Sequence, residues 1–319
     1  MVLNNTKENK SFSELLQASF KSDDTEEWLD VHFTRPIGLV FALFWNKFGI
    51  HPNVITILSI FLGIGSGWMF CYEDLPHNIM GVVLLMLANF CDSTDGQMAR
   101  LTGKKTLIGR MLDGFSGDVW FFCIYAAFAY RLMDDNIPFT NHTWGFLSWV
   151  LAFVAGVFFH SPQSSLSDYY RQIHLFLLKG KNGSELDNYA SQRAIYESLP
   201  KSDVLGRAFY FNYANYCKSQ ERRTPEFQKL MSALKDKYNG AEKMPTDIKD
   251  RFLSVSRTLM PLTNILTFNT RAICVYISAL TGLPYLYMIF EITVMQQMYV
   301  YMHRKHEKLC RETLLTINN

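Results

Sequence analysis

Long apolar runs, separated by polar turns and one large charged block, constrain this 319-residue chain more than any other feature. A helix needs about 20 mostly apolar residues to cross the hydrocarbon core of a bilayer. Six segments reach or approach that length, namely residues 54–72, 78–98, 108–131, 143–161, 262–281 and 283–302. Because a backbone inside lipid must satisfy its own hydrogen bonds, the chain is predicted to be an all-α integral membrane protein with six transmembrane helices.

A shorter apolar stretch precedes the first of these segments. Pro36–Ile50 is too short to span and carries Lys47, and His51-Pro52-Asn53 then breaks the chain. An apolar helix of this kind lies in the plane of the membrane surface. We therefore expect an N-terminal interfacial amphipathic helix before the first span.

Positive charge is distributed unevenly among the polar segments. It collects in the turn 100–110, in the block 162–257, which holds roughly half of all Lys and Arg, and in the tail 304–319. The loops that would lie on the other side contain almost no Lys or Arg. Because an excess of Lys and Arg marks cytoplasmic loops, the prediction is a multi-pass protein with both termini in the cytoplasm.

The block 162–257 is charged and amphipathic rather than apolar. Within Pro225–Tyr238, Phe227, Leu230 and Leu234 recur at helical spacing. The block is therefore predicted to be a cytoplasmic helical insertion. The expected segments are a cytoplasmic N-terminus (1–35), the interfacial helix with four spans (36–161), the insertion (162–257), the last two spans (258–303) and a basic tail (304–319).

Four aspartates stand at the mouths of the second and third expected spans. They are Asp92, Asp95, Asp113 and Asp118. Carboxylates at such depth are costly and usually functional. Asp92 and Asp95 are three residues apart and share one helix face. Clustered carboxylate oxygens suit hard cations such as Mg²⁺ or Mn²⁺, and two such ions can hold a diphosphate. The cluster would lie on the cytoplasmic face, where nucleotides are available.

The spacing of these residues resembles the signature of the CDP-alcohol phosphatidyltransferase family, DxxDGxxARx(8)GxxxDxxxD. The matching positions are Asp92, Asp95, Gly96, Ala99, Arg100, Gly109 and Asp113. A further element before the first span, His51-Pro52-Asn53-Val54-Ile55-Thr56, is similar to the family's PNxxT-like motif. The resemblance covers residues 36–161 by motif and the last two spans by hydropathy alone.

The resemblance implies a metal-dependent phosphotransferase of phospholipid biosynthesis. The acceptor hydroxyl would attack a CDP-linked donor, with CDP-diacylglycerol the commonest, and CMP would leave. Two Mg²⁺ or Mn²⁺ ions would be bound by the aspartates, with Asp118 also acting as the catalytic base. The nucleotide site would be formed by Asn53, Thr56, Gly96, Ala99, Arg100 and Gly109.

The last aspartate of the signature is displaced by one residue. Gly117 stands at the expected position and Asp118 follows it. On a regular helix these two positions differ by about 100°. Three explanations are open: a helix bulge at Gly114 or Gly117 turns Asp118 into the site, another group serves as base, or the site is inactive.

Two arginines are candidate ligands for an acceptor phosphate. Arg171 follows the fourth span, where an interfacial anchor is the alternative role. Arg271 lies about midway along the fifth span, where it either binds phosphate or extends towards the interface. Glu291 lies within the sixth span, and we expect it to form a helix–helix hydrogen bond rather than to act in catalysis.

The sequence therefore predicts an enzyme that transfers a phosphatidyl or phospho-alcohol group to an acceptor hydroxyl. Its partners would be the donor, the alcohol acceptor and membrane lipids, and the resemblance makes a homodimer the default expectation. The aromatic run Phe209–Tyr216 lacks a basic stripe, so no nucleic acid is expected. The alternatives are an inositol- or ceramide-phospholipid synthase with the same chemistry, or a non-catalytic lipid-binding relative without the final aspartate.

Overall fold

The structure is a computed structural model that describes residues 11–20, 22, 24–104 and 106–318. The described residues form helices and turns, with one isolated β-bridge between Asn136 and Thr143. The chain divides into two units. Unit 1 comprises the described part of Met1–His160 together with Phe268–Thr293, and unit 2 comprises Ser161–Thr267 and Val294–Asn319. The all-α prediction is thus confirmed.

Unit 1 contains the segment that precedes the first expected span, the first four expected spans and most of the last two. Its elements are α1 (Phe12–Ser19), η1 (Asp30–Thr34), α2 (Arg35–Lys47), α3 (Pro52–Phe70), α4 (Leu75–Thr102), α5 (Leu107–Leu132), α6 (Leu147–Phe153), η2 (Val154–His160), α12 (Phe268–Leu280), α13 (Tyr285–Phe290) and the start of η5 (Glu291–Met295). The segments η1, η2 and η5 are π-helical. Among the helices of the described residues, two, α3 and α4, are long and apolar enough to cross a membrane.

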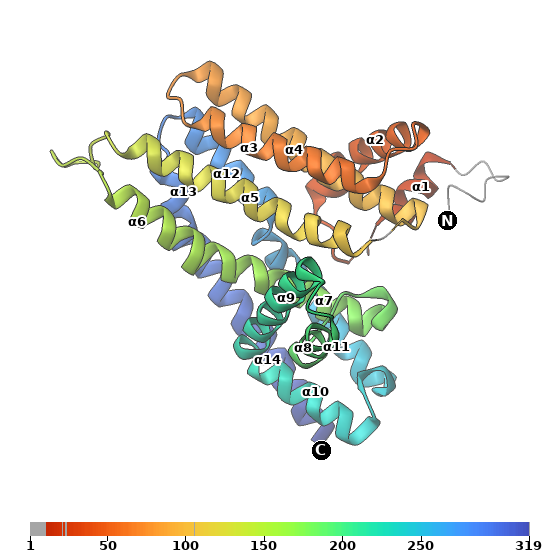
Figure 1. The fold of residues 1–319 in the computed structure, drawn as a ribbon. Helices are drawn as coiled ribbons and strands as arrows, with labels where there is room; N and C mark the ends of the chain where they lie inside the picture. Colours follow the sequence, from red (N-terminus) through yellow and green to blue (C-terminus); the bar gives the residue numbers. More distant parts are fainter. Residues whose placement is uncertain (1–10, 21, 23, 105, 319) are drawn as a thin grey trace. The chain divides into compact units, whose positions relative to one another are not determined.

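The long helices α3, α4 and α5 form the main bundle of unit 1, and α3 packs against both of the others (Figure 1). Gly63 and Gly67, one turn apart on α3, make this approach possible. A Cβ at Gly63 would collide with the Trp120 ring, and one at Gly67 would lie 2.6 Å from Cys123 Cβ on α5. Pairs of small residues four apart are a common means of close helix packing in membranes.

Local capping explains where these helices begin. The Asp74 side chain accepts a hydrogen bond from His77 N (3.1 Å) at the start of α4, and Thr106 accepts one from Gly109 N (2.9 Å) at the start of α5. Such side chains satisfy backbone N–H groups that have no partner within the helix. α4 ends at Thr102, and its C-cap, Gly103, has a φ of 73°. The turn that joins α4 to α5 therefore has fixed ends, and the aspartates lie on both sides of it.

α2 occupies most of the segment expected to lie in the membrane interface. Gly38, Leu39 and Ala42 are buried, whereas Phe41 and Phe44 are exposed. The buried side faces α4, since a Cβ at Gly38 would lie 2.6 Å from Gln97 Nε2. The helix thus presents an apolar face that unit 1 does not cover.

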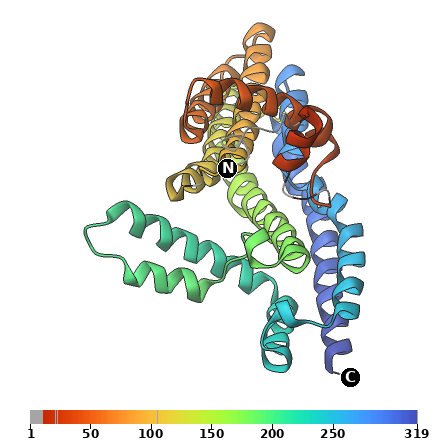
Figure 2. The ribbon, with the colours of Figure 1, turned by 90° about the vertical axis from the view of Figure 1, so that its right-hand side faces the viewer.

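Unit 2 is a second helical assembly. It contains α7 (Ser161–Lys179), η3 (Lys181–Gly183), α8 (Tyr189–Ser198), α9 (Val204–Arg223), α10 (Pro225–Tyr238), η4 (Ala241–Lys243), α11 (Thr246–Ile265) and α14 (Gln296–Asn318). Figure 2 shows α8 and α9 as a hairpin extending from the rest of the unit. α10 has the bounds expected from the sequence and buries Phe227, Leu230 and Leu234. The helical character of the insertion is thus confirmed, while its cytoplasmic location stays a prediction.

Candidate active site

Three of the four aspartates come together in unit 1. Asp92 and Asp95 lie near the end of α4, and Asp113 lies in the second turn of α5. Each offers a carboxylate oxygen, and the three oxygens lie within 4.8 Å of one another. The short capped turn between the helices brings the two sides together. This arrangement follows from the motif spacing, because residues three apart on α4 face the same side.

The cluster has the donor set and burial expected of a site for a hard cation. Asp95 is only 4% exposed, and its Oδ2 atom is buried with no hydrogen-bond partner among the described residues. An orphaned buried carboxylate oxygen is costly. A divalent cation coordinated by carboxylates would remove that cost, because Mg²⁺ and Mn²⁺ prefer oxygen ligands. The residues present therefore fit a metal ion.

Ser116 was not identified from the sequence. It is 1% exposed, and its hydroxyl lies 3.1 Å from Asp92 Oδ1 and 2.8 Å from the Asp113 carbonyl oxygen. A hydroxyl donates one proton, which these two acceptors compete for or share. Ser116 thus ties Asp92 on α4 to the Asp113 turn of α5. Its only sequence signal is its position three residues after Asp113, on the same helix face.

Asp118 does not belong to this group of three carboxylates. α5 is regular α-helix from Leu107 to Leu132 and contains no π-helical segment. The bulge expected at Gly114 or Gly117 is therefore absent from this helix, and that explanation is wrong. Five residues of regular helix turn Asp118 by about 140° from Asp113 and raise it about 7.5 Å along the axis. Its side chain is exposed, and its expected metal and catalytic roles stay predictions.

Asn53 and Gly109, both predicted to shape the nucleotide site, lie against each other where α3 and α5 begin. Asn53 Nδ2 lies 3.3 Å from Thr106 Oγ1, and Asn53 Oδ1 lies 3.3 Å from the same hydroxyl. A Cβ at Gly109 would lie 2.8 Å from Asn53 Oδ1 and 3.0 Å from Thr106 Oγ1. A larger residue than glycine would therefore displace one of these two side chains, where the starts of α3 and α5 approach each other. Thr106 was also missed, although a Thr before an apolar helix is a recognisable N-cap signal.

Four further predicted residues remain, and three of them, Gly96, Ala99 and Arg100, follow Asp95 on α4. Thr56 is buried on α3, and its hydroxyl donates to the Pro52 carbonyl oxygen at 3.3 Å. Ala99 is half-buried on α4, one turn after Asp95. The guanidinium of Arg100 folds back over Gly96, so that a Cβ there would lie 3.3 Å from Arg100 Nη1. Their nucleotide-binding roles stay predictions.

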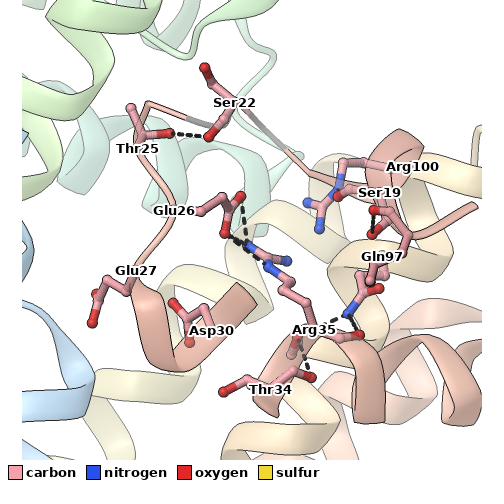
Figure 3. A network of polar contacts seen from close by, with 12 residues as sticks. Ser19, Ser22, Thr25, Glu26, Glu27, Asp30, Thr34, Arg35, Gln97 and Arg100 are labelled. Atoms are coloured by element: carbon pink, nitrogen blue, oxygen red, sulfur yellow. Dashed lines mark hydrogen bonds and ion pairs between the residues drawn. The ribbon is translucent and has the colours of Figure 1, made fainter. Parts of the chain in front are cut away.

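Arg100 is held by the N-terminal part of unit 1 (Figure 3). Its Nε donates to the Ser19 carbonyl oxygen at 2.6 Å, while its Nη2 is buried and has no hydrogen-bond partner among the described residues. Glu26, Arg35, Asp95 and Asp113 are the charged groups that act on it. Arg100 therefore lies between the acidic cluster and an Arg35–Glu26 ion pair, with part of its donor capacity unused.

The two candidate phosphate-binding arginines have different surroundings. Arg171 lies on α7 in unit 2, and its assignment stays a prediction. Arg271 lies on α12 in unit 1, is 1% exposed, and donates from Nε to Glu291 Oε1 at 2.6 Å. The helix–helix hydrogen bond expected of Glu291 is confirmed. Arg271 thus has a buried carboxylate as its partner. The sequence had suggested phosphate binding or extension towards the interface, and neither role included this pair.

The comparisons with known proteins agree with the motif. Residues 49–164, a little over a third of the chain, match the family model described as CDP-alcohol phosphatidyltransferase. An archaetidylinositol phosphate synthase of Pyrococcus horikoshii is 28% identical over 106 residues, which cover 33% of this chain and 48% of that protein. An uncharacterized protein of Aquifex aeolicus is 40% identical over 70 residues, covering 22% and 34%. The chain thus spans less than half the length of the curated relatives it matches. The part that contains the acidic cluster, residues 49–164, carries the similarity to CDP-alcohol phosphatidyltransferases inferred from its motif.

Proposed function

We propose that this chain is an integral membrane phosphotransferase that makes a phosphodiester lipid by displacing CMP from a CDP-linked donor. The observation that carries the proposal is the cluster of Asp92, Asp95 and Asp113, in which a buried Asp95 oxygen finds no hydrogen-bond partner in the residues that the structure describes. The family match of residues 49–164 supports the kind of reaction. CDP-diacylglycerol is the donor we propose, and the acceptor is an alcohol.

The charges around the cluster favour two divalent ions. Three carboxylates and Arg100 sum to −2, and the diphosphate of a CDP-linked lipid adds about −2. Two Mg²⁺ or Mn²⁺ ions would balance this sum, and when bound they would neutralise the diphosphate and stabilise the leaving CMP. Asp92, Asp95 and Asp113 would hold the ions, and Ser116 would fix the orientation of Asp92.

The remaining residues would bind the donor and move the proton. Arg100 offers its unused N–H groups to a phosphate oxygen. Asn53, Thr56, Gly96, Ala99 and Gly109 would shape the nucleotide site. We propose Asp118 as the base because a base must reach the acceptor hydroxyl and need not share the metal's ligands. As the acceptor oxygen bonds to the lipid-linked phosphorus, the bond to CMP breaks and the hydroxyl proton passes to Asp118.

We also propose the topology that the loop charges favour. α3 and α4 would be two of six spans, with both termini and the acidic cluster in the cytoplasm and α2 lying in the membrane interface. The exposed apolar face of α2, which includes Phe41 and Phe44, supports this position for the helix. The homodimer expected from the family resemblance belongs to the same proposal.

An inositol-containing product is the second candidate function. It is favoured by the name of the Pyrococcus relative, an archaetidylinositol phosphate synthase. The two candidates differ only in the acceptor. Supplying glycerol phosphate, serine, inositol or inositol phosphate as separate acceptors to the same preparation would distinguish them.

The test is CMP release from CDP-diacylglycerol by the purified protein in detergent. We expect release with Mg²⁺ or Mn²⁺, and its loss on chelation and in the Asp92→Asn variant. Absence of CMP release from every CDP-linked donor tried, together with unchanged metal binding in Asp92→Asn, would contradict the proposal. It would then favour the non-catalytic lipid-binding alternative.

A further inference from the structure

A network of polar contacts joins the N-terminal part of unit 1 to α4 (Figure 3), and two further hydrogen bonds join it to α12. We name residues 24–35 the clamp segment. Its far end is fixed to α4, where Gln97 Nε2 donates to the Arg35 carbonyl oxygen at 3.0 Å. Its middle is fixed to α12, where Asn269 Nδ2 donates to Glu27 Oε2 at 2.7 Å and to Asp30 Oδ1 at 3.1 Å. The clamp segment thus connects two helices that lie far apart in sequence.

Charged side chains fix the clamp segment internally as well. Arg35 and Glu26 form a bidentate pair, with Arg35 Nε 3.1 Å from Glu26 Oε2 and Nη2 3.3 Å from Oε1. The side chain of Glu26 is only 1% exposed. Bidentate pairs of this geometry restrict both partners in orientation. Glu26 therefore neutralises the charge of Arg35. Without this pair, the positive charge of Arg35 would add to that of Arg100.

Arg100 lies beside the clamp segment, and the charges of Arg35 and Glu26 act on its guanidinium. Its Nε donates to the carbonyl oxygen of Ser19, which precedes the clamp segment, and its Nη1 lies over Gly96. Its buried Nη2 has no hydrogen-bond partner within the described part of the chain. A guanidinium has five N–H donors in a fixed planar fork, so fixing Nε determines where the other donors point. An unpartnered buried donor beside a carboxylate cluster points to an anionic ligand placed between Arg100 and cations that the carboxylates would hold.

We propose that the clamp segment positions Arg100 for the donor's diphosphate, with Asn269 as the residue that holds the clamp closed. The inference rests on the proposed function, since it takes the ligand to be a CDP-linked donor. Asn269, Glu27 and Asp30 are positioning residues that act on the ligand only through the clamp and Arg100. No contact of theirs with the aspartates is needed.

The test separates nucleotide affinity from metal affinity. In Asn269→Asp, a carboxylate would face Glu27 and Asp30, and the like charges would open the clamp. We expect the dissociation constant for CDP, measured by calorimetry with Mg²⁺, to rise about tenfold, the size of one charge-assisted hydrogen bond. Mn²⁺ binding without nucleotide, followed by electron paramagnetic resonance, should change less than twofold. A general loss of structure would weaken both.

Two further variants control for folding. In the triple variant Asn269→Asp, Glu27→Gln and Asp30→Asn, the new carboxylate at 269 can accept hydrogen bonds from the two new amides. This variant should return CDP affinity to within twofold of the wild type. Glu27→Gln with Asp30→Asn alone removes the acceptors' charge without repulsion, and it should weaken CDP binding by about threefold. Hydrogen exchange of amides 24–34 should rise in Asn269→Asp and fall again in the triple variant.

Each other outcome has a definite meaning. Faster exchange in residues 24–34 with unchanged CDP affinity would overturn the inference, because the clamp would then open without affecting Arg100. Tighter CDP binding in Asn269→Asp would also overturn it, since the clamp would then block the site. If the wild type binds Mn²⁺ but neither CDP nor any CDP-linked lipid, the proposed function fails and the inference with it.

Discussion

The acidic cluster and the Arg271–Glu291 pair, both in unit 1, differ in charge balance. The acidic cluster brings three carboxylates within 4.8 Å of one another. The second group pairs Arg271 with Glu291 at 2.6 Å, and Tyr287 donates to the same carboxylate oxygen at 3.5 Å. The first group has an excess of negative charge, whereas the second is neutral as a whole. Like charges at this separation repel, while a matched buried pair is stable without a ligand.

The difference indicates which group binds a ligand. A protein keeps a destabilising like-charge cluster when a bound cation compensates for it. A balanced pair needs no compensation, and its role is to hold α12 against the helix that contains Glu291. Arg271 is thereby a weaker candidate for the acceptor phosphate than its position in the sequence implied, because its Nε is already bonded to a buried carboxylate.

The largest effect is expected from Asp95→Asn. Loss of a buried metal ligand should reduce CMP release by about 10⁴-fold. Without divalent ions the same change should raise the melting temperature, because it removes one of three like charges. CMP release and thermal melting in EDTA, both in detergent, measure the two effects. Lower stability in EDTA would show that the three carboxylates are not a repulsive cluster.

For the Arg271–Glu291 pair, removal of one charge is expected to lower the stability of the protein rather than raise it. Arg271→Met would leave Glu291 buried without its cation, at a cost of about 3–5 kcal/mol in the free energy of unfolding. The double variant Arg271→Met/Glu291→Met should recover most of that loss, since apolar replacement of a buried pair is often neutral. Thermal melting of the three proteins tests this. An Arg271→Met variant that is stable but fails to bind acceptor would instead support the phosphate-binding role.

The sequence was sufficient to predict the acidic cluster because local geometry determines it. Asp92 and Asp95 share a face of any helix, and the capped turn between α4 and α5 returns the chain at a short distance. The contacts of the clamp segment with α12 were not predictable in the same way. Glu27 and Asn269 are separated by 242 residues, and isolated polar contacts between distant segments leave no periodic pattern in a sequence.

The bulge in α5 failed as a prediction for a different reason. Gly114 and Gly117 permit a departure from helical geometry but do not require one. The structure shows π-helical segments elsewhere, at η1, η2 and η5, and two of them, η1 and η5, contain no glycine. Glycine content therefore indicates where a helix can deform, while packing decides whether it does.

Asp118→Asn separates the base from the metal ligands. If Asp118 accepts the proton of the acceptor hydroxyl, kcat should fall about 100-fold. Mn²⁺ affinity should stay within twofold of the wild type, because Asp118 lies outside the group of three carboxylates. The matched variant Asp113→Asn should lose both activity and Mn²⁺ binding. Activity within threefold of the wild type in Asp118→Asn would assign the base to another group.

The smallest effect concerns the packing that supports the acidic cluster. In Gly109→Ala the new methyl group would meet Asn53 Oδ1 and Thr106 Oγ1, so these side chains would have to shift and their hydrogen bond would be disturbed. We expect a cost of about 1 kcal/mol in the free energy of unfolding and a severalfold rise in the KM for the donor. Gly114→Ala, also on α5, is the matched control, since a Cβ there would have no heavy atom within 4 Å. Alanine favours helix over glycine, so this control should be neutral or more stable. Equal effects of the two substitutions would show that alanine is tolerated at 109 as at 114. The contact of Gly109 with Asn53 would then not support the site.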